Sequence, residues 1–228
     1  MSKGTLPTFY DKNNMFEIGI DEAGRGPLFG RLYVAGVVLP KDGSMDMSSI
    51  KDSKKVSKKR LPVLYDYIIT HALAYDIVFI DALEIDKINI RQSVLKGMRL
   101  CAENIMKKLE NVPLKEEDKK LTPFFLLIDG NDFQPMHNHS TEVPFKTFIH
   151  GDNSYASIAA ASILAKVARD NYIRELCKKY PVLSEKYGMD KHMGYGTKIH
   201  LEAIQKYGAT QFHRFSYGCC KSADVFVI

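Results

Sequence analysis

The chain has 228 residues, of which 45% are hydrophobic and 26% charged, and it contains only 9 Pro and 15 Gly. This composition suits one globular domain, or one domain with a small appendage, and excludes disordered, collagen-like and coiled-coil chains. The longest apolar run, residues 32–39, is far shorter than the ~20 residues of a membrane helix, and residues 1–15 are too polar for a signal peptide. We therefore expect a cytoplasmic protein with no membrane partner.

Charge and cysteine content narrow the class only slightly. The 32 Lys and Arg exceed the 27 Asp and Glu by 5, which favours a polyanionic partner mildly. Residues 51–60 (KDSKKVSKKR) carry six basic residues against one acid; such a run either follows phosphates or is a solvated surface, and charge alone favours the surface. The 4 Cys show no CxxC pair or zinc spacing, so free thiols are expected.

The first part of the chain predicts two strands joined by a glycine turn, followed by a helix and a third strand. Residues 16–21 alternate in polarity before the break at AGRGP, and residues 31–39 form a second, β-branched run. Residues 57–74 have helical periodicity, with Pro62 in the early turns, and residues 75–80 are predicted to form a strand. The expected order is strand, strand, helix, strand.

The middle of the chain adds two long helices and two strands. Residues 90–109 place apolar side chains at three- or four-residue intervals, so one face of a helix packs inward, and residues 110–122 form a loop. Residues 124–129 (FFLLID) are typical of a strand buried on both faces, and residues 144–149 predict a weaker strand. Residues 154–180 open with small polar residues and close on lysines, as helix capping and the macrodipole favour.

Beyond Pro181 the pattern changes to short segments. A glycine loop at residues 193–197 (MGYGT) precedes a helix over residues 198–207 and an aromatic tail. No internal repeat or Gly/Ser linker separates this part from the rest. We predict an α/β core over residues 1–180 and a small helical extension over residues 181–228 that packs on the core.

Acidic residues follow the predicted strands. Asp21 and Glu22 close the first strand directly before the glycine turn. Adjacent strand residues point to opposite faces, so both reach one metal cluster only at a strand end where the pleat breaks. Asp129 ends the strand FFLLID, at the edge where ligands bind in α/β sheets. Taken singly, each acid is equally well explained as a capping or exposed surface residue.

Asp152 precedes the alanine-rich helix and is, by itself, best explained as a helix-capping acid. Together, however, four carboxylates at strand ends and a helix start are the hard oxygen ligands that hold Mg²⁺ or Mn²⁺. Asp170 lies about five helical turns beyond Asp152, which is too far to join the site. We expect it to form an ion pair with Arg169 or Arg174, or to have a capping role elsewhere.

The glycine turn has a second possible role. Gly24 and Gly26 flank Arg25, and their missing Cβ atoms allow main-chain groups to approach a sugar hydroxyl closely. A phosphate-binding loop is the competing interpretation, but GRGPLFG lacks the GK[ST] ending and precedes a strand, so we discount it. Tyr195, between two glycines, either stacks on a nucleotide or packs the extension on the core.

The sequence closely resembles the ribonuclease HII family over nearly its whole length. The strings DEAGRG and SIAAASI with the following AKV and RD are highly specific, and the order and spacing of the matching segments are those of the family. The matching segments are GIDEAGRGPLFGRLYVAGVVL at 19–39, KDSKKVSKKRL at 51–61, EIDKINI at 84–90, LLIDGND at 126–132, GDNSYASIAAASILAKVARD at 151–170 and GYGTKIHLEAIQKYG at 194–208. The resemblance implies a ribonuclease H-like mixed sheet flanked by helices.

The resemblance also implies an activity. The family's enzymes are endonucleases that cut on the 5′ side of a ribonucleotide, in RNA/DNA hybrids or in duplex DNA, leaving 3′-hydroxyl and 5′-phosphate ends by two-metal-ion catalysis. The alternatives are a non-catalytic nucleic-acid-binding subunit of the same fold and a helper that needs partner subunits. A non-catalytic subunit is expected to have lost an acid, and none is missing. The helper is separated by testing the purified chain alone for cleavage, and we expect no obligate protein subunit.

The resemblance assigns roles residue by residue. It implies that two ions of Mg²⁺ or Mn²⁺ are bound by the catalytic acids Asp21, Glu22, Asp129 and Asp152. It implies that the ribonucleotide's 2′-hydroxyl is contacted by Gly24, Arg25 and Gly26. Tyr195 would support the junction, and Lys54 would meet a backbone phosphate.

The sequence departs from the family pattern at three positions. His150 stands where a lysine commonly precedes the Gly-Asp pair, and Ala209 and Phe215 replace a more usual proline and arginine. These positions are peripheral to the acids, so they bear on substrate handling and not on the chemistry. The glycine loop resembles the single-chain bacterial form, the 20 residues before Asp21 argue against type 3, and the tail SADVFVI does not resemble a sliding-clamp peptide.

Overall fold

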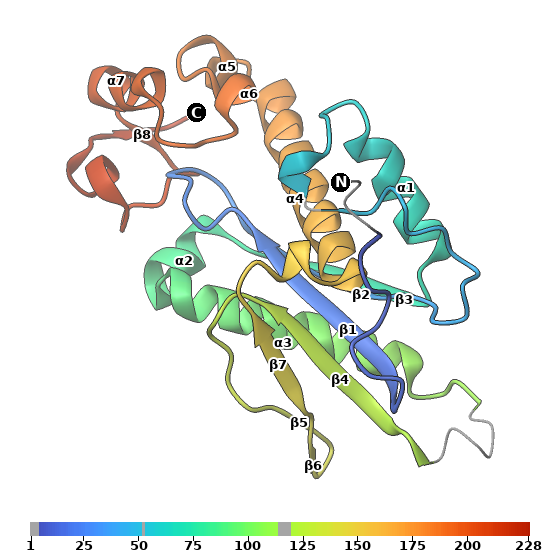
Figure 1. Cartoon of the computed structure of the whole chain (residues 1–228). Coiled ribbons are helices and arrows are strands. Elements are labelled where there is room, and N and C mark those ends of the chain that lie inside the picture. The colour runs from blue at the N-terminus through green and yellow to red at the C-terminus, as the bar shows by residue number, and fades with distance from the viewer. Residues whose placement is uncertain (1–4, 52, 114–119) are drawn as a thin grey trace.

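The computed structural model describes residues 5–51, 53–113 and 120–228. Residue 52 of the basic run and residues 114–119 of the predicted loop lie outside this description. A five-stranded sheet in the order β3-β2-β1-β4-β7 forms the centre (Figure 1). Its strands are β1 (Asn14–Ala23), β2 (Leu32–Val38), β3 (Ala74–Ile80), β4 (Thr122–Asp129) and β7 (Phe145–Phe148). β2 pairs antiparallel with both β1 and β3, and β4 pairs parallel with both β1 and β7. The predicted mixed sheet is therefore confirmed.

Helices cover both faces of the sheet (Figure 1). The described helices are α1 (Leu61–His71), α2 (Ala82–Ile88), α3 (Ile90–Leu109), α4 (Ala156–Lys179), α5 (Val182–Glu185), α6 (Met189–His192) and α7 (Lys198–Tyr207), of which α5 to α7 belong to residues 181–228. Short 3₁₀ turns η1 (Ser53–Lys55), η3 (Gly151–Asn153) and η4 (Gly218–Ser222) and the small strands β5 (His137–Asn138), β6 (Thr141–Glu142), β8 (Ala209–Thr210) and β9 (Val225–Phe226) complete the list.

The strand β2 is buried on both faces, which explains its continuous apolar sequence. Val34 points toward α3 and belongs to one buried cluster, whereas Ala35 and Val37 point toward α4 and belong to another. This alternation is the two-residue period of an extended chain. Two hydrophobic cores, one on each face, therefore hold the sheet between α3 on one side and α1 and α4 on the other.

Most predicted elements are confirmed, and the differences have local causes. The helix α3 has the predicted bounds, whereas α1 begins at Leu61, four residues later than predicted, because Pro62 occupies its first turn. The helix α4 begins at Ala156, and Ser154 does not cap it because a separate 3₁₀ turn precedes it. The unpredicted α2 begins where the Asp81 carboxylate accepts a hydrogen bond from the Glu84 amide (2.9 Å).

Residues 181–228 pack against the C-terminal half of α4 and the loop between β1 and β2. Phe29 and Ile173 from the first part of the chain share a buried cluster with Leu183 and Ile204 of the extension. A domain boundary at residue 180 remains a prediction. All four cysteines are free thiols, as expected. Within the described parts of the chain, no helix has both the length and the apolar character needed to cross a bilayer.

Close contact between β1 and α4 depends on Gly19. A Cβ atom at this position would lie 2.3 Å from the main-chain carbon of Ser157, in the first turn of α4. We expect Gly19→Ala to lower the free energy of unfolding by about 3 kcal/mol, since backbone must move to relieve the overlap. The control is Gly43→Ala, which meets nothing within 4 Å but has a φ of +78°, and should cost about 1 kcal/mol. Equal losses in urea unfolding would contradict the packing argument.

Candidate active site

Parallel pairing of β1 and β4 brings two acids together. The register aligns Ile20 with Ile128, so the next residues, Asp21 and Asp129, lie on neighbouring strands at the same edge of the sheet. Asp21 does not end its strand, as the sequence had suggested, because β1 continues to Ala23 and Asp21 still pairs with Ala35. The strand therefore carries Asp21 and Glu22 in extended backbone.

A cleft of about 280 Å³ opens at this edge. It is lined by Asp21, Glu22, Ala23, Gly24, Arg25, Gly26, Ser53, Lys54, Asp129, Ser162, Lys166 and Tyr195. All the predicted site residues except Asp152 are therefore brought together, although they come from β1, η1, β4 and the extension.

Asp152 lies beside this cleft and not in its lining. It is buried, with 4% of its surface exposed, in the 3₁₀ turn η3. Its neighbour Gly151 donates a hydrogen bond from its amide to Asp129 Oδ1 (2.6 Å), and Asn153 donates one to Asp152 Oδ1 (2.9 Å). The fourth acid is thus linked to the third through one residue of backbone, and Tyr155 occupies the N-cap position of α4.

The electrostatics of the cleft disfavour its negative charges. Burial raises the pKa of Asp21 well above its ordinary value, and the charges of Glu22 and Asp129 raise it further. Burial also raises the pKa of Glu22, while the guanidinium of Arg25, 3.4 Å from its Oε1, opposes this effect. Three carboxyl groups on adjacent strands therefore repel one another in a place that water reaches poorly.

Such a donor set fits a hard divalent cation, which prefers carboxylate oxygens and would offset this repulsion. Among residues 5–51, 53–113 and 120–228, however, no group of three or more His, Cys, Asp or Glu side chains is arranged to hold an ion. One oxygen of each carboxyl is engaged inside the chain: Asp21 Oδ1 accepts from the Glu22 amide (2.6 Å), Glu22 pairs with Arg25, and Asp129 accepts from Gly151. The donor chemistry fits a metal ion, and the ligand geometry is not preset in this conformation.

The glycine turn is held by two buried arginines. Gly24 has a φ of +102°, and a Cβ there would lie 2.4 Å from Arg169 Nε, so this glycine makes room for an arginine as well as for a ligand. The carbonyl oxygen of Arg25 accepts hydrogen bonds from Arg214 Nη1 (3.1 Å) and the Tyr217 hydroxyl (3.0 Å). The extension thereby fixes the main chain of the turn.

The ribonuclease HII family profile matches residues 18–220. The chain belongs to the ribonuclease HII family. Curated proteins named ribonuclease HII from Francisella tularensis subsp. mediasiatica (strain FSC147) and subsp. novicida (strain U112) are 43% identical over 203 residues. The match covers 89% of this chain and 95% and 96%, respectively, of those proteins.

Solved structures of ribonucleases HII and HIII have a similar fold. The PCNA-bound RNase HII of Archaeoglobus fulgidus aligns with a TM-score of 0.66 at 22% identity, covering 90% of this chain and 96% of that one. The ribonuclease H2 of Pyrococcus horikoshii OT3 aligns with a TM-score of 0.63 at 24% identity, covering 91% and 96%. Bst-RNase HIII in complex with Mn²⁺ aligns with a TM-score of 0.60 at 17% identity, covering 91% and 68%.

Within this ribonuclease HII fold, α4 supplies two cleft residues that the sequence analysis missed. Ser162 and Lys166 lie four residues apart, with Asp170 four further on, so one helical face carries all three. This spacing was the available signal. Asp170 pairs with Lys166 and with Arg174 (3.9 Å), so the predicted Arg174 pair is confirmed.

The other predicted partner of Asp170 was wrong. Arg169 points to the opposite side and donates to the carbonyl oxygens of Phe29 (3.2 Å), Arg31 (3.3 Å) and Met193 (3.0 Å). Its guanidinium also lies 5.7 Å from the centre of the Tyr195 ring. Its role in this ribonuclease HII is therefore to join the β1–β2 loop to the glycine loop of the extension.

The three departures from the ribonuclease HII pattern lie outside the cleft lining. His150 adopts a left-handed conformation (φ 57°) directly before η3. Ala209 is buried in β8, and the amide of Phe215 donates to Asp86 Oδ2 (2.7 Å) in α2.

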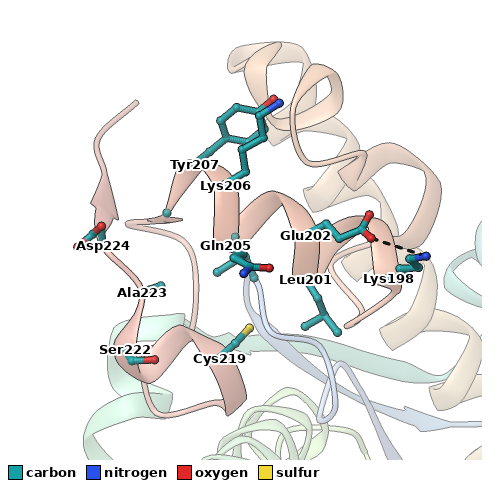
Figure 2. Close-up of a pocket in the computed structure, with 12 residues that line it drawn as sticks. Lys198, Leu201, Glu202, Gln205, Lys206, Tyr207, Cys219, Ser222, Ala223 and Asp224 are labelled. Atoms are coloured by element: carbon teal, nitrogen blue, oxygen red, sulfur yellow. Dashed lines mark ion pairs between the residues drawn. The ribbon is translucent and has the colours of Figure 1, made fainter.

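A larger hollow, of about 750 Å³, lies in the extension between α7 and the C-terminal segment (Figure 2). Its charged groups include Lys198 and Glu202, which form an ion pair of 3.8 Å along α7. None of the predicted site residues lines it. The larger hollow is therefore separate from the smaller cleft in which Asp21, Glu22 and Asp129 converge.

Charge repulsion in the cleft predicts an unusual stability effect. Because the folded state raises the pKa of Asp21, the ionised carboxylate destabilises the fold at a pH above that pKa. Without divalent ions, Asp21→Asn should therefore raise the free energy of unfolding at pH 8. The advantage should shrink as pH falls and wild-type Asp21 takes up its proton.

The measurement is urea unfolding of both proteins in EDTA at pH 8 and pH 5. The control is Asp66→Asn, which removes one charge from an exposed position on α1. A loss of stability at pH 8 in Asp21→Asn alone would contradict the repulsion argument.

Proposed function

We propose that this chain is an endonuclease that hydrolyses the phosphodiester on the 5′ side of a ribonucleotide. Its substrates are RNA/DNA hybrids and duplex DNA with embedded ribonucleotides, and its products carry 3′-hydroxyl and 5′-phosphate ends. The observation that carries this proposal is the placement of Asp21 and Asp129 on the neighbouring strands β1 and β4, in the lining of a cleft that also includes the Gly24–Gly26 turn and Tyr195. Membership of the ribonuclease HII family supports it.

The acids Asp21, Glu22, Asp129 and Asp152 would hold Mg²⁺ or Mn²⁺, with two ions during catalysis. Ions held by these residues would supply a lower pKa for the attacking water and positive charge beside the phosphate and the leaving oxygen. Support comes from the oxygen donor set and from the Mn²⁺ complex of the neighbour Bst-RNase HIII. Phosphoryl transfer asks little more of the protein than positioning and charge neutralisation.

The basic side of the cleft would hold the substrate's backbone. Lys54, from the chain's basic run, lines the cleft, and Arg25 has 57% of its side chain exposed beside Glu22. A phosphate contacted by Lys54 would position the strand without reading its sequence. In this proposal Lys54 binds the phosphate backbone through its charge, and the glycine turn recognises the sugar.

Recognition of ribose requires contact with the 2′-hydroxyl or with helix shape. Arg214 and Tyr217 hold the main chain of the glycine turn in place, which favours contact with the 2′-hydroxyl. If a main-chain polar group of the turn pairs with this hydroxyl, a bound deoxyribose leaves that group unpaired, at a cost of about 1–3 kcal/mol. The Tyr195 ring, 47% exposed and close to Gly26, would support the sugar at the junction with DNA.

A chain with this fold could have one of two other functions. A non-catalytic binding subunit would retain the cleft without turnover, and a helper would cut only with other subunits; cleavage by the purified chain excludes both.

The structure of the Archaeoglobus neighbour was solved in complex with PCNA. We propose that this chain acts without a clamp, since its C-terminal Val225–Phe226 strand pairs with β8, and that it works in the cytoplasm.

Asp129→Asn tests the catalytic assignment. Loss of a ligand charge should lower cleavage of a labelled duplex containing one ribonucleotide by at least about 100-fold in Mg²⁺ or Mn²⁺. Substrate affinity, measured in Ca²⁺ or EDTA by anisotropy, should stay within about threefold because the phosphate contacts are unchanged. Asp66→Asn is the charge-matched control. Turnover near the wild-type rate in Asp129→Asn would remove this acid from the mechanism.

Tyr195→Ala tests junction recognition. Loss of the ring should lower cleavage at a single ribonucleotide by about 5-fold or more, as expected for 1–3 kcal/mol of stacking. A continuous RNA strand offers many registers and should be affected less. Tyr195→Phe keeps the ring and should retain the wild-type ratio of the two rates. An equal loss on both substrates would make Tyr195 a packing residue.

A further inference from the structure

A buried chain of hydrogen bonds ends at Tyr195. His200 and His213 are 0% and 1% exposed, and neither lines the cleft. Their Nε2 atoms are 3.0 Å apart, His213 Nδ1 lies 2.9 Å from the Thr210 amide, and His200 Nδ1 lies 3.0 Å from the Tyr195 carbonyl oxygen. A third ring, His192, stacks on His200 with centroids 4.9 Å apart.

The partners at the two ends fix the direction of every bond. A main-chain amide only donates, so His213 Nδ1 accepts from Thr210 and the neutral ring carries its proton on Nε2. That proton is donated to His200 Nε2, which leaves the His200 proton on Nδ1. His200 Nδ1–H then donates to the Tyr195 carbonyl oxygen. Two neutral rings with opposite tautomers satisfy all three contacts.

The environment keeps both rings neutral. Burial lowers the pKa of His200 to about 4 and that of His213 to about 3, and the charge of each ring's neighbouring histidine acts in the same direction. The surrounding cluster is largely apolar, with Phe29 packed edge-on against His213 (5.0 Å between centroids). Two imidazoles are costly in such a place unless every nitrogen is paired. An apolar pair would fill the space without that requirement, so the polar pair needs a reason.

The reason lies at Tyr195, where the chain of hydrogen bonds leaves the buried cluster. The Tyr195 ring is half-exposed and is not enclosed by other side chains, so its position depends on how its main chain is held. Its carbonyl oxygen accepts from His200 Nδ1 and from the Thr197 amide (2.8 Å), while its amide donates to the His192 carbonyl oxygen (3.0 Å). Arg169 fixes the preceding Met193 carbonyl.

We propose that His200 is a positioning residue that orients the Tyr195 ring beside the Gly24–Gly26 turn, and that His213 selects the His200 tautomer this requires. The inference deepens the proposed function, on which its catalytic consequence rests. It places the control of ribonucleotide recognition in the C-terminal extension, at residues that do not touch the substrate. His200 acts through a loop and takes no part in the reaction itself.

Two substitutions at His200 separate its two bonds. In His200→Asn the side-chain amide nitrogen lies near the place of Nδ1 and retains the bond to Tyr195, while the contact with His213 is lost. In His200→Gln the side-chain oxygen lies near the place of Nε2 and accepts from His213, while the bond to Tyr195 is lost. Both remove an imidazole from the same cluster, so each is the other's control for stability.

A fluorescent reporter reads the loop without any activity. The chain has no Trp, so Tyr195→Trp introduces a single one. In that background His200→Gln should increase acrylamide quenching and lower the anisotropy of the tryptophan, whereas His200→Asn should leave both close to the parent values. Thermal unfolding of the two variants should show similar losses.

The second measurement uses the native Tyr195. His200→Gln should lower the ratio of cleavage at a single ribonucleotide to cleavage of an RNA/DNA hybrid by about fivefold, as expected for one hydrogen bond of about 1 kcal/mol. His200→Asn should stay within about twofold of wild type, and His200→Gln should change the ratio no further in Tyr195→Ala.

Several results would overturn the inference. One is equal tryptophan quenching and anisotropy in His200→Asn and His200→Gln. Another is an equal loss of cleavage on both substrates in His200→Gln. The third is a more mobile tryptophan in His200→Gln together with an unchanged ratio of the two cleavage rates. A wild-type chain that cuts neither substrate would instead defeat the proposed function, and the fluorescence comparison would still decide whether His200 holds the loop.

Discussion

The parallel pairing of β1 with β4 is the constraint on which the site depends. It places Asp21 beside Asp129 at one edge of the sheet, although more than a hundred residues of chain separate them. The strands are held in register by their hydrogen bonds and by cores on both faces, so neither acid can move away from the other. Folding thus forces together charges that repel, and the site is a local cost to stability that a bound cation would offset.

The extension completes this site from the other side. Arg169 and Arg214, both buried, donate to carbonyl oxygens of the β1–β2 loop, and Arg169 also holds the glycine loop. Guanidinium groups suit this work because several donors in one rigid plane bind several carbonyls at once. The glycine turn and Tyr195 are therefore positioned relative to each other by groups that lie behind them.

The two halves of the site differ in how they are held. Asp21, Glu22 and Asp129 sit on strands and Asp152 sits in the turn η3, whereas Gly24 to Gly26 and Tyr195 sit on loops that polar groups anchor in an apolar surrounding. The anchoring groups are Arg169, Arg214 and the His200–His213 pair, each buried with its hydrogen bonds directed at main-chain atoms. The strands therefore position Asp21, Glu22 and Asp129, whereas α4 and the extension anchor the loops that carry the glycine turn and Tyr195.

The sequence by itself determined the mixed α/β class, the bounds of α3 and α7, the family and many residues of the cleft, though not Ser162 or Lys166, because periodicity and short motifs are local properties. It did not determine that Asp21 and Glu22 lie within β1, that Asp152 sits in a 3₁₀ turn linked to Asp129, or that Arg169 turns away from Asp170. Nor did it join His200 and His213 to Tyr195. Those facts depend on strand register and on contacts between distant segments, which only the packed tertiary structure fixes.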